Sequence, residues 1–209
     1  MPNPIIFPSS IQWVGLAKEV TYGTAVTPPT VWIPIDNPVH TPNLAMLTDT
    51  ALRGNMAYAQ AQVAGTISHD FTYSTNLYLD TCFYHFLGIL GYPDAVTGSV
   101  DPFTHKTALL DTSDGQPPSY TLYLFNGSEA WQMAGCKVTS LDVDIKPDGL
   151  ITLTPAWKGS AAVKVTTPAN TPSTALPVQG WNTTVTVASV GTSVYTGAKI
   201  SLKRNQGFR

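Results

Sequence analysis

One stretch of this chain, residues 75–90, repeats its apolar residues at the spacing of an α-helix, and this restricts the fold more than any other feature. Within TNLYLDTCFYHFLGIL, apolar side chains recur at intervals of three and four residues: Leu79, Phe83, Phe86 and Leu90. Side chains at this spacing share one face of a helix. Gly88 or Gly91, together with Pro93, can end the helix. We therefore predict a single helix that packs one side against a core.

Most of the remaining chain predicts β-strands. Asn126-Gly127 and the sequence KPDG at residues 146–149 indicate hairpin turns. Alternating or β-rich patterns place strands in these ranges: 11–17, 31–35, 57–64 and 66–73 as a hairpin turning at Gly65, 103–110, 119–126, 129–134, 137–145, 150–159, 183–190 and 198–203. We expect a mainly β fold, an antiparallel β-sandwich or barrel with one flanking α-helix at about residues 75–90. A single domain over residues 1–209 is the expectation from the length.

Two segments do not fit this pattern and predict contacts outside the domain. Residues 1–12 are apolar but broken by prolines, which indicates an N-terminal arm that has to bury Ile5, Ile6 and Phe7 against another surface. Residues 36–56 are polar and irregular, and they are longer than an ordinary connection. We expect them to form a long loop that reaches a neighbouring subunit.

Charge is unusually sparse in this chain. Only 11% of its residues are charged, whereas a solvated domain usually has about a quarter. This suggests that much of the surface contacts other protein. A net charge of −2 provides no basic surface for tight nucleic-acid binding. The chain begins without a positive n-region, and its apolar runs are too short to span a membrane, so we expect neither export nor membrane insertion.

The sequence contains none of the common motifs for catalysis or cofactor binding. The sequence has no phosphate-binding loop, dinucleotide fingerprint or GxSxG motif. Its four histidines lack zinc-site spacing. Asp142, Asp144 and Asp148 are not followed by the Glu that closes a calcium loop. We expect no enzyme activity, metal or cofactor. Cys82 and Cys136 are expected to be buried and reduced, with a disulfide as the open alternative.

A series of short motifs carries a family resemblance. The segment VGLAKEVTYGTAVTPPTVWIPI at residues 14–35 contains Gly15, Lys18-Glu19, Tyr22-Gly23-Thr24 and Pro28. Further motifs follow in order: Leu52-Arg53-Gly54, Gly65, LGILG at the helix end, Pro102-Phe103-Thr104-His105, Pro118-Ser119-Tyr120-Thr121-Leu122, and Ala134-Gly135-Cys136-Lys137-Val138 with Ser140-Leu141. Over residues 14–160 the chain resembles the major tail (tail tube) proteins of long-tailed, siphovirus-type bacteriophages. At the C-terminus, ISLKRNQGFR resembles a segment after which many relatives continue with further strands, so we expect either a short member or a chain whose C-terminal part is missing.

The resemblance implies a structural virion protein of the tail, assembled in the host cytoplasm. Copies of such a protein form hexameric rings that stack into a tube. The tube is a channel for the tape-measure protein during assembly and for the genome during ejection. The implied partners are the chain itself, the tape-measure protein, and tail tip and terminator proteins. Double-stranded DNA passes without specific binding.

Candidate site residues follow from this function. An acidic or neutral channel wall lets DNA slide, and Asp142 and Asp144 are the candidates for the lumen. The candidates for contacts between subunits or rings come from the arm, the loop and the helix: Ile5, Ile6, Phe7, Leu47, Leu52, Arg53, Tyr78, Tyr84 and His85.

Two other function classes remain open at this point. A related hexameric tube protein of a contractile injection or secretion system would share the fold and the symmetry. A monomeric carbohydrate-binding or adhesin-like β-sandwich would instead use exposed tryptophans, for which the candidates are Trp13, Trp32, Trp131, Trp157 and Trp181.

Overall fold

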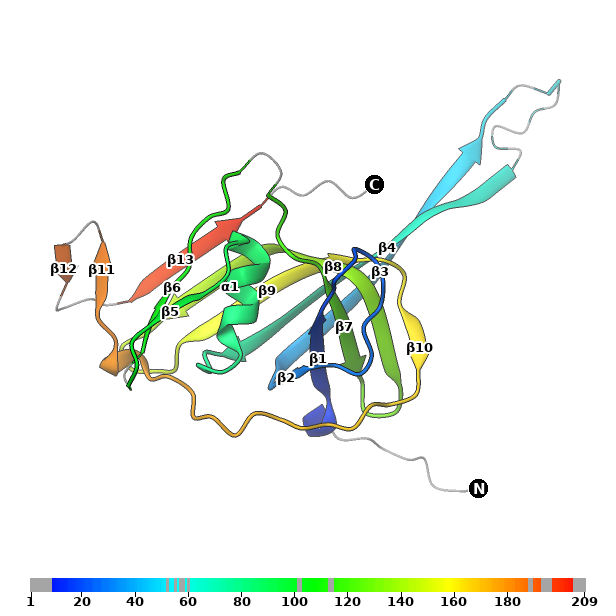
Figure 1. Cartoon of the computed structure of the whole chain (residues 1–209). Coiled ribbons are helices and arrows are strands. Elements are labelled where there is room, and N and C mark those ends of the chain that lie inside the picture. The colour runs from blue at the N-terminus through cyan, green and yellow to red at the C-terminus, as the bar shows by residue number, and fades with distance from the viewer. Residues whose placement is uncertain are drawn as a thin grey trace.

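The computed structural model describes residues 9–51, 53–54, 56, 59, 61–100, 103–112, 115–187, 190–192 and 197–204. The fold is mainly β, as predicted, with one α-helix in the described part of the chain (Figure 1). Its elements are η1 (Ser9–Ile11), β1 (Trp13–Lys18), β2 (Val31–Ile33), β3 (Asp36–Asp49), β4 (Ala61–Asn76), α1 (Cys82–Leu90), β5 (Ala95–Thr97), β6 (Thr104–Lys106), β7 (Tyr120–Phe125), β8 (Ala130–Ile145), β9 (Thr152–Gly159), β10 (Val163–Val165), η2 (Gly180–Asn182), β11 (Val185–Val187), β12 (Val190–Thr192) and β13 (Ala198–Lys203). Among the described residues, no helix has the length and apolar character needed to cross a membrane.

Nine strands form one antiparallel sheet that the long strand β8 divides into two halves. Residues 130–136 of β8 pair with β7 and β10, which gives sheet A, in the order β2-β1-β7-β8-β10. Residues 137–145 pair with β9 and β13, which gives sheet B, in the order β3-β4-β9-β8-β13. A positive φ of 66° at Gly135 and a register shift between Val138 and Ser140 bend β8 where it passes from one half to the other.

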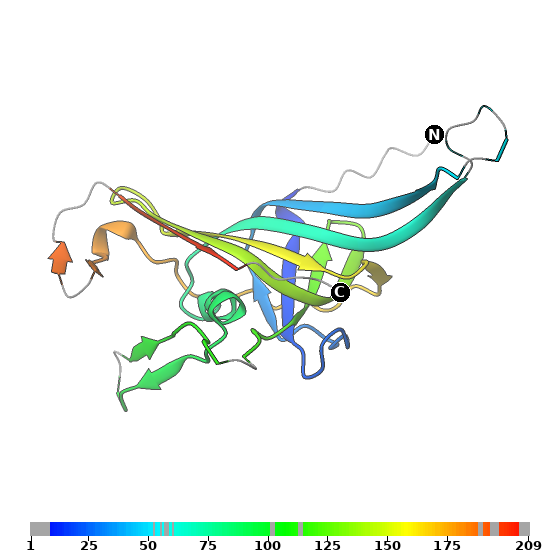
Figure 2. The same cartoon turned by 90° about the horizontal axis from the view of Figure 1, so that it is seen from above.

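The core lies between the two halves and is covered by α1, as Figure 2 shows from above. Strand β7 is buried on both faces, as its sequence predicts. On sheet B, the side chains that face the core alternate with polar side chains that face away. The largest buried side chains come from both halves: Trp157, Tyr73, Phe71 and Leu141 from sheet B, and Tyr120, Tyr123, Leu16 and Met133 from sheet A.

Helix α1 is shorter than predicted and presents a different face to the core. Residues 75 and 76 belong to β4, and the helix runs from Cys82 to Leu90. Its buried residues are Cys82, His85, Gly88 and Ile89. Leu79, predicted to face the core, is 62% exposed because it lies in the turn before the helix. The C-terminus is closed by Gly91, with φ at 86°, and by Arg204, which donates to the carbonyl oxygens of Ile89 and Leu90 at 3.3 and 3.4 Å.

Two predictions about residues 36–73 were wrong. The expected long loop at 36–56 is strand β3 as far as Asp49, and the expected hairpin turn at Gly65 is the interior of the sixteen-residue strand β4. Strand β3 is an edge strand that carries prolines and is largely exposed, so it has the composition of a loop. Gly65 lies beside a register irregularity between Leu44 and Met46, where a Cβ atom would stand 3.0 Å from the Ala45 carbonyl oxygen.

The other sequence predictions had mixed outcomes. The strands expected at 11–17, 119–126, 150–159 and 198–203 are present within two residues of those limits. The break expected between 134 and 137 is absent because β8 is continuous, and the strand expected at 103–110 is limited to Thr104–Lys106. Cys82 and Cys136 are both buried and free, so the disulfide alternative does not apply.

Candidate assembly surfaces

The outer face of sheet B, turned away from the core, is polar. In β8 the buried residues Leu141 and Val143 alternate with Asp142 and Asp144, which are partly exposed. The same alternation on the neighbouring strands places these residues on the outer face: Asp70 and Thr72 on β4, Thr152, Thr154 and Lys158 on β9, and Lys199, Ser201 and Lys203 on β13. Figure 2 shows this layer of long strands on the side of the molecule opposite the β5–β6 hairpin.

Several charges of this outer face have neighbours of opposite sign, although Lys158 is also the cross-strand partner of Lys137. The Lys146 Nζ atom lies 3.3 Å from Asp144 Oδ2, and Lys199 is the cross-strand partner of Asp144. Asp70 is the cross-strand partner of Lys158. Pairs of this kind attract across adjacent strands. Asp142 and Asp144 therefore belong to a surface of mixed sign, and not to a uniformly acidic one.

The hairpin formed by β3 and β4 projects from the body. Strand β4 pairs with β9 only from His69 onward, so residues 61–68 have β3 as their only strand partner among the described residues. Eight residues in an extended strand span about 26 Å, and this projection is visible in Figures 1 and 2. The exposed apolar side chains of this hairpin lie on both sides of the ribbon, because the register shift between Leu44 and Met46 adds one residue to β4. Leu44, Met46 and Ile67 lie on the side of the core residue Phe71, and Leu47 and Val63 lie on the opposite side. We call these five residues the hairpin apolar residues. Among the described residues, both sides of this ribbon are therefore largely exposed.

The contact residues predicted from the loop and the arm are partly described. Leu47 is one of the hairpin apolar residues and is exposed. The Arg53 guanidinium donates to the Asp49 carboxylate near the end of the hairpin. Ile5, Ile6, Phe7 and Leu52 lie outside the described residues.

The three contact residues predicted around the helix differ in their burial. Tyr78 is half-buried and forms an isolated β-bridge with Pro177. Tyr84 is half-buried, and its carbonyl oxygen accepts a hydrogen bond from the Tyr120 hydroxyl at 3.2 Å. His85 is fully buried, so its prediction as a contact with a neighbouring subunit was wrong.

His85 is instead part of the core. Its Nε2 atom lies 2.8 Å from the Tyr73 hydroxyl, and its ring packs edge-on against Trp157 with 6.2 Å between the ring centroids. Burial lowers the pKa of His85 from 6.5 to about 4. The ring is therefore neutral at physiological pH, which suits an enclosed apolar environment.

Glu19 joins segments that are far apart in the sequence, and the sequence analysis missed this role. Its Oε2 atom accepts hydrogen bonds from the Gly23 backbone N–H at 2.9 Å and from the Ser119 hydroxyl at 2.7 Å. Its Oε1 atom accepts from the Thr121 hydroxyl at 2.9 Å and from the Gly135 backbone N–H at 2.8 Å. Each partner belongs to one of the motifs that carry the family resemblance. The motifs could have signalled that these segments meet, but not that a carboxylate joins them.

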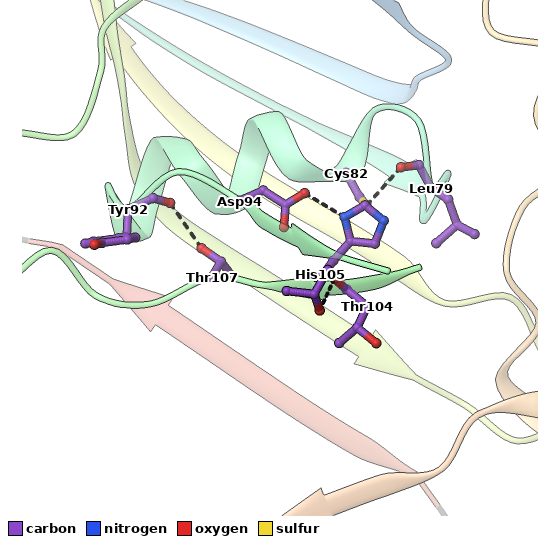
Figure 3. Close-up of polar contacts among 8 residues, drawn as sticks. Leu79, Cys82, Tyr92, Asp94, Thr104, His105 and Thr107 are labelled. Carbon is purple, nitrogen blue, oxygen red and sulfur yellow. Dashed lines mark hydrogen bonds and ion pairs between the residues drawn. The ribbon is translucent and has the colours of Figure 1, made fainter. Parts of the chain in front are cut away.

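A second hairpin, β5–β6, is fastened to the side of α1 that faces away from sheet B (Figures 2 and 3). The His105 Nδ1 atom lies 2.6 Å from Asp94 Oδ2, and the His105 ring stacks on Phe83 with 4.4 Å between centroids. The Thr107 hydroxyl donates to the Tyr92 carbonyl oxygen at 3.3 Å. These contacts give the Thr104-His105 motif a structural role.

Two of the four histidines meet at the base of the projecting hairpin, although the sequence places them far apart. The His40 Nε2 atom lies 2.6 Å from His69 Nδ1, and the two rings are stacked. Burial lowers the pKa of both rings. In the described part of the chain, no group of three or more His, Cys, Asp or Glu side chains is arranged to hold a metal ion.

A comparison with known protein families gives a match over most of the chain. The family model described as phage tail tube protein matches residues 12–207. No curated protein matches the chain significantly. Phage tail tube proteins are structural components of the virion that assemble with copies of themselves into a tube. The match extends over nearly the whole length of a mainly β chain, and the chain belongs to the phage tail tube protein family.

Proposed function

We propose that this structural virion protein forms hexameric rings in which sheet B of each copy pairs with sheet B of the next. The observation that carries the proposal is that β3 and β13, the two edges of sheet B, each pair on one side only among the described strands. Exposed edges favour pairing with another chain. Pairing β3 of one copy with β13 of its neighbour is a head-to-tail contact, and such contacts close into a ring when the rotation allows it. The number of six subunits per ring is what the motif resemblance implies.

In this arrangement the outer face of sheet B lines the channel. The core-facing side of the sheet is already covered by α1 and sheet A, so the polar side is available for the lumen. Its charges are of mixed sign, and in this proposal the carboxylates of Asp142 and Asp144 beside the lysines weaken the hold of this face on DNA phosphates. The proposed cargo is the tape-measure protein during assembly and the double-stranded genome during ejection. Tail tip and terminator proteins bind the two ends, and assembly takes place in the host cytoplasm.

The hairpin apolar residues support a further part of this proposal. A ribbon that projects about 26 Å and carries exposed apolar side chains on both sides is long enough to reach a neighbouring subunit. We assign Leu47 and Arg53 to this contact, together with Ile5, Ile6, Phe7 and Leu52, which lie outside the described residues. Tyr78 and Tyr84 remain candidates at the surface near α1.

The carbohydrate-binding alternative has fewer candidate tryptophans than the sequence offered. Trp13 and Trp157 are buried in the core and cannot stack on a sugar. Trp32 and Trp131 are half-buried, which leaves Trp181 as the exposed tryptophan among the five candidates.

Electron microscopy of the purified full chain tests the proposed function. We expect rings or tubes with sixfold symmetry, and sedimentation should show assemblies larger than a monomer. Uniformly monomeric, strand-rich particles would contradict the proposal. Rings with another rotational symmetry would contradict the hexamer but would leave edge pairing in place.

A further inference from the structure

The projecting ribbon of β3 and β4 joins the body through a short length of regular strand pairing. Cross-strand pairs run without interruption over residues 39–44 of β3 and 67–72 of β4, and a register irregularity lies at each end of this segment. We call these two stretches the ribbon root. Pairing of β4 with β9 begins within the root, at His69. A short ladder between two irregularities is a place at which paired strands can separate locally.

Two histidines meet on the core side of the ribbon root. His40 lies opposite Phe71 and His69 lies opposite Pro42, so the two imidazoles approach each other diagonally across β3 and β4. The His40 ring also lies edge-on to Phe71, with 6.3 Å between the ring centroids. Phe71 in turn packs on Tyr73, with 5.5 Å between the centroids. The histidine pair therefore connects both strands of the root to the aromatic core.

The distance between the two imidazole nitrogens limits the number of protons that the pair can hold. His40 Nε2 and His69 Nδ1 are 2.6 Å apart, so a single hydrogen lies between them. With both rings neutral, or with one ring charged, one nitrogen donates and the other accepts. With both rings charged, every ring nitrogen carries a hydrogen and neither can accept. Two positive charges at this distance also repel each other, so the contact is incompatible with the doubly charged state.

The nearest carboxylate compensates only in part for positive charge on the pair. Asp70 follows His69 on β4 and lies on the outer face of sheet B, where its cross-strand partner is Lys158. Burial lowers the pKa of His69, and the smaller effect of the Asp70 carboxylate raises it. Burial and the charge of His69 both lower the pKa of His40. The pair is therefore neutral at physiological pH and collects its protons in acid, below pH 6.5.

The described residues that face the pair from β3, β9 and an adjoining cavity carry no charge. The cross-strand partners of His69 are Pro42 on β3 and Gly159 on β9. His40 borders a cavity of about 230 Å³ that is also lined by Gln12, Pro38, Leu124, Asn126 and Trp131. Because amide side chains take part in this lining, the cavity has room for water that can bring protons to the pair.

We propose that the His40–His69 pair is a pH-dependent switch: the doubly charged state breaks the contact, separates β3 from β4 at the ribbon root and frees the projecting ribbon from its fixed angle to the body. The strand pairs beyond Leu44 lie across a register irregularity from the root, so they can stay paired while the root opens. The switch operates in each copy of the chain whether or not copies form rings, so it is independent of the proposed function.

Amide hydrogen exchange of the full chain between pH 7.5 and pH 5 tests the switch. Each exchange rate is divided by the rate of an unfolded peptide at the same pH, which gives a protection factor that reports local opening. We expect the protection of the ribbon root to fall at least tenfold more than that of β7 over this range. Strand β7 is buried on both faces, so its protection reports global unfolding.

A variant without titrating groups separates protonation from packing. His40→Gln combined with His69→Asn places amide groups near the former Nε2 and Nδ1 positions, and amides do not change charge in this range. We expect this double variant to keep the protection of the root at pH 5. The matched control is His105→Gln, which removes a histidine from the β5–β6 hairpin and should leave the acid response unchanged.

A consequence for assembly does rest on the proposed function, which assigns the ribbon to a contact with a neighbouring subunit. Tubes formed at pH 7.5 should shorten on transfer to pH 5, and tubes of the double variant should keep their length. A protein that forms no tubes at pH 7.5 would contradict the proposed function, whereas the exchange experiment would still test the switch.

Three results of the exchange experiment would overturn the switch. They are an equal loss of root protection in the unmodified protein and the double variant, a root that follows β7 at every pH, and an acid response that disappears in His105→Gln. If the double variant has already lost root protection at pH 7.5, the imidazole ¹⁵N shifts of the unmodified protein decide. Both rings must become charged over the pH range in which the root loses protection, and rings that become charged while the root stays protected contradict the switch.

Discussion

The Glu19 carboxylate is tolerated in the interior because the fold supplies four hydrogen-bond donors to it. Two hydroxyls and two backbone N–H groups donate to its carboxylate, and the residue is 6% exposed. Hydrogen bonds to an ionised acceptor are stronger than those between neutral groups. Removal of the carboxylate would leave buried donors without acceptors, which costs more than the loss of the bonds alone.

We therefore expect Glu19→Ala to lower the free energy of unfolding by about 3 kcal/mol. Glu19→Gln should lower it less, because the amide keeps one acceptor oxygen. The matched control is Glu129→Ala, which removes a carboxylate from a partly exposed pair with Lys164 and should cost less than about 1 kcal/mol. Urea unfolding measures all three variants. Equal effects of Glu19→Ala and Glu129→Ala would contradict the role assigned to Glu19.

His85 gives a pH dependence of stability. Its pKa is about 4 in the folded protein and 6.5 in an unfolded chain, so between these values the unfolded chain binds more protons. The contribution of His85 to the free energy of unfolding is therefore present in full above pH 6.5. It is lost as the pH drops towards 4, by up to about 3 kcal/mol. Substitution His85→Gln, which keeps an acceptor for the Tyr73 hydroxyl, should reduce this slope in urea unfolding between pH 7 and pH 4. His40 and His69 have lowered pKa values and contribute in the same direction, so the comparison is the slope of the variant against that of the unmodified protein. Parallel slopes would contradict the assignment.

Helix α1 depends on a close approach at Gly88. A Cβ atom at this position would stand 2.6 Å from the Val138 Cγ2 atom on β8. Alanine favours a helix by about 1 kcal/mol over glycine, but overpacking in a core commonly costs about 2 kcal/mol. At this site the steric cost of the added methyl group exceeds the gain in helix propensity.

Gly88→Ala should therefore destabilise the protein, and Val138→Ala should partly rescue it by removing the methyl group that the new Cβ meets. Thermal or urea unfolding of the two single variants and the double variant forms a cycle that measures this coupling. We expect the double variant to be more stable than the sum of the two single losses. Additive losses would show that the contact does not determine the packing of α1.

Local patterns predicted some elements of this fold and missed others for physical reasons. The end of α1 was predictable because Gly91 adopts the left-handed conformation that a helix end favours, and β7 was predictable because both of its faces are buried. The strands predicted at 57–64 and 66–73 cover most of the projecting part of β4, but its continuity through Gly65 was missed, because residues 61–68 are largely exposed on both faces and show no inside–outside alternation. The Glu19 cluster could not be derived from spacing, since its partners lie 4 to 116 residues away. The polar face with Asp142 and Asp144 was predictable from the period of two in β8, whereas the neighbouring lysines that balance it come from other strands.

At the scale of the whole molecule, we expect the balance of charge on the outer face of sheet B to affect the passage of cargo through the tube more than the stability of the fold. Asp142→Lys combined with Asp144→Lys would place lysines beside Lys146 and Lys199 and make this face basic. We expect tubes to assemble, and phage that carry the variant to eject their genome more slowly, because phosphates would be retained in the channel. A potassium-release or dye-uptake assay follows ejection.

A control with the same change in charge is Asp111→Lys combined with Glu129→Lys, which lie outside the outer face of sheet B. This variant should eject at the normal rate. Normal assembly and normal ejection by the Asp142 and Asp144 variant would remove the support for a lumenal position of these residues.

Strand β8 belongs to both halves of the sheet, and this has a mechanical consequence. A force along sheet B does not have to cross a layer of side chains to reach sheet A, because the covalent backbone of β8 carries it through the bend at Gly135. The hydrogen bonds of Glu19 to Gly135, Ser119 and Thr121 brace that bend from the side. The two layers therefore share an applied load as one body. We expect the protein to unfold under tension in a single step, without one layer unfolding before the other.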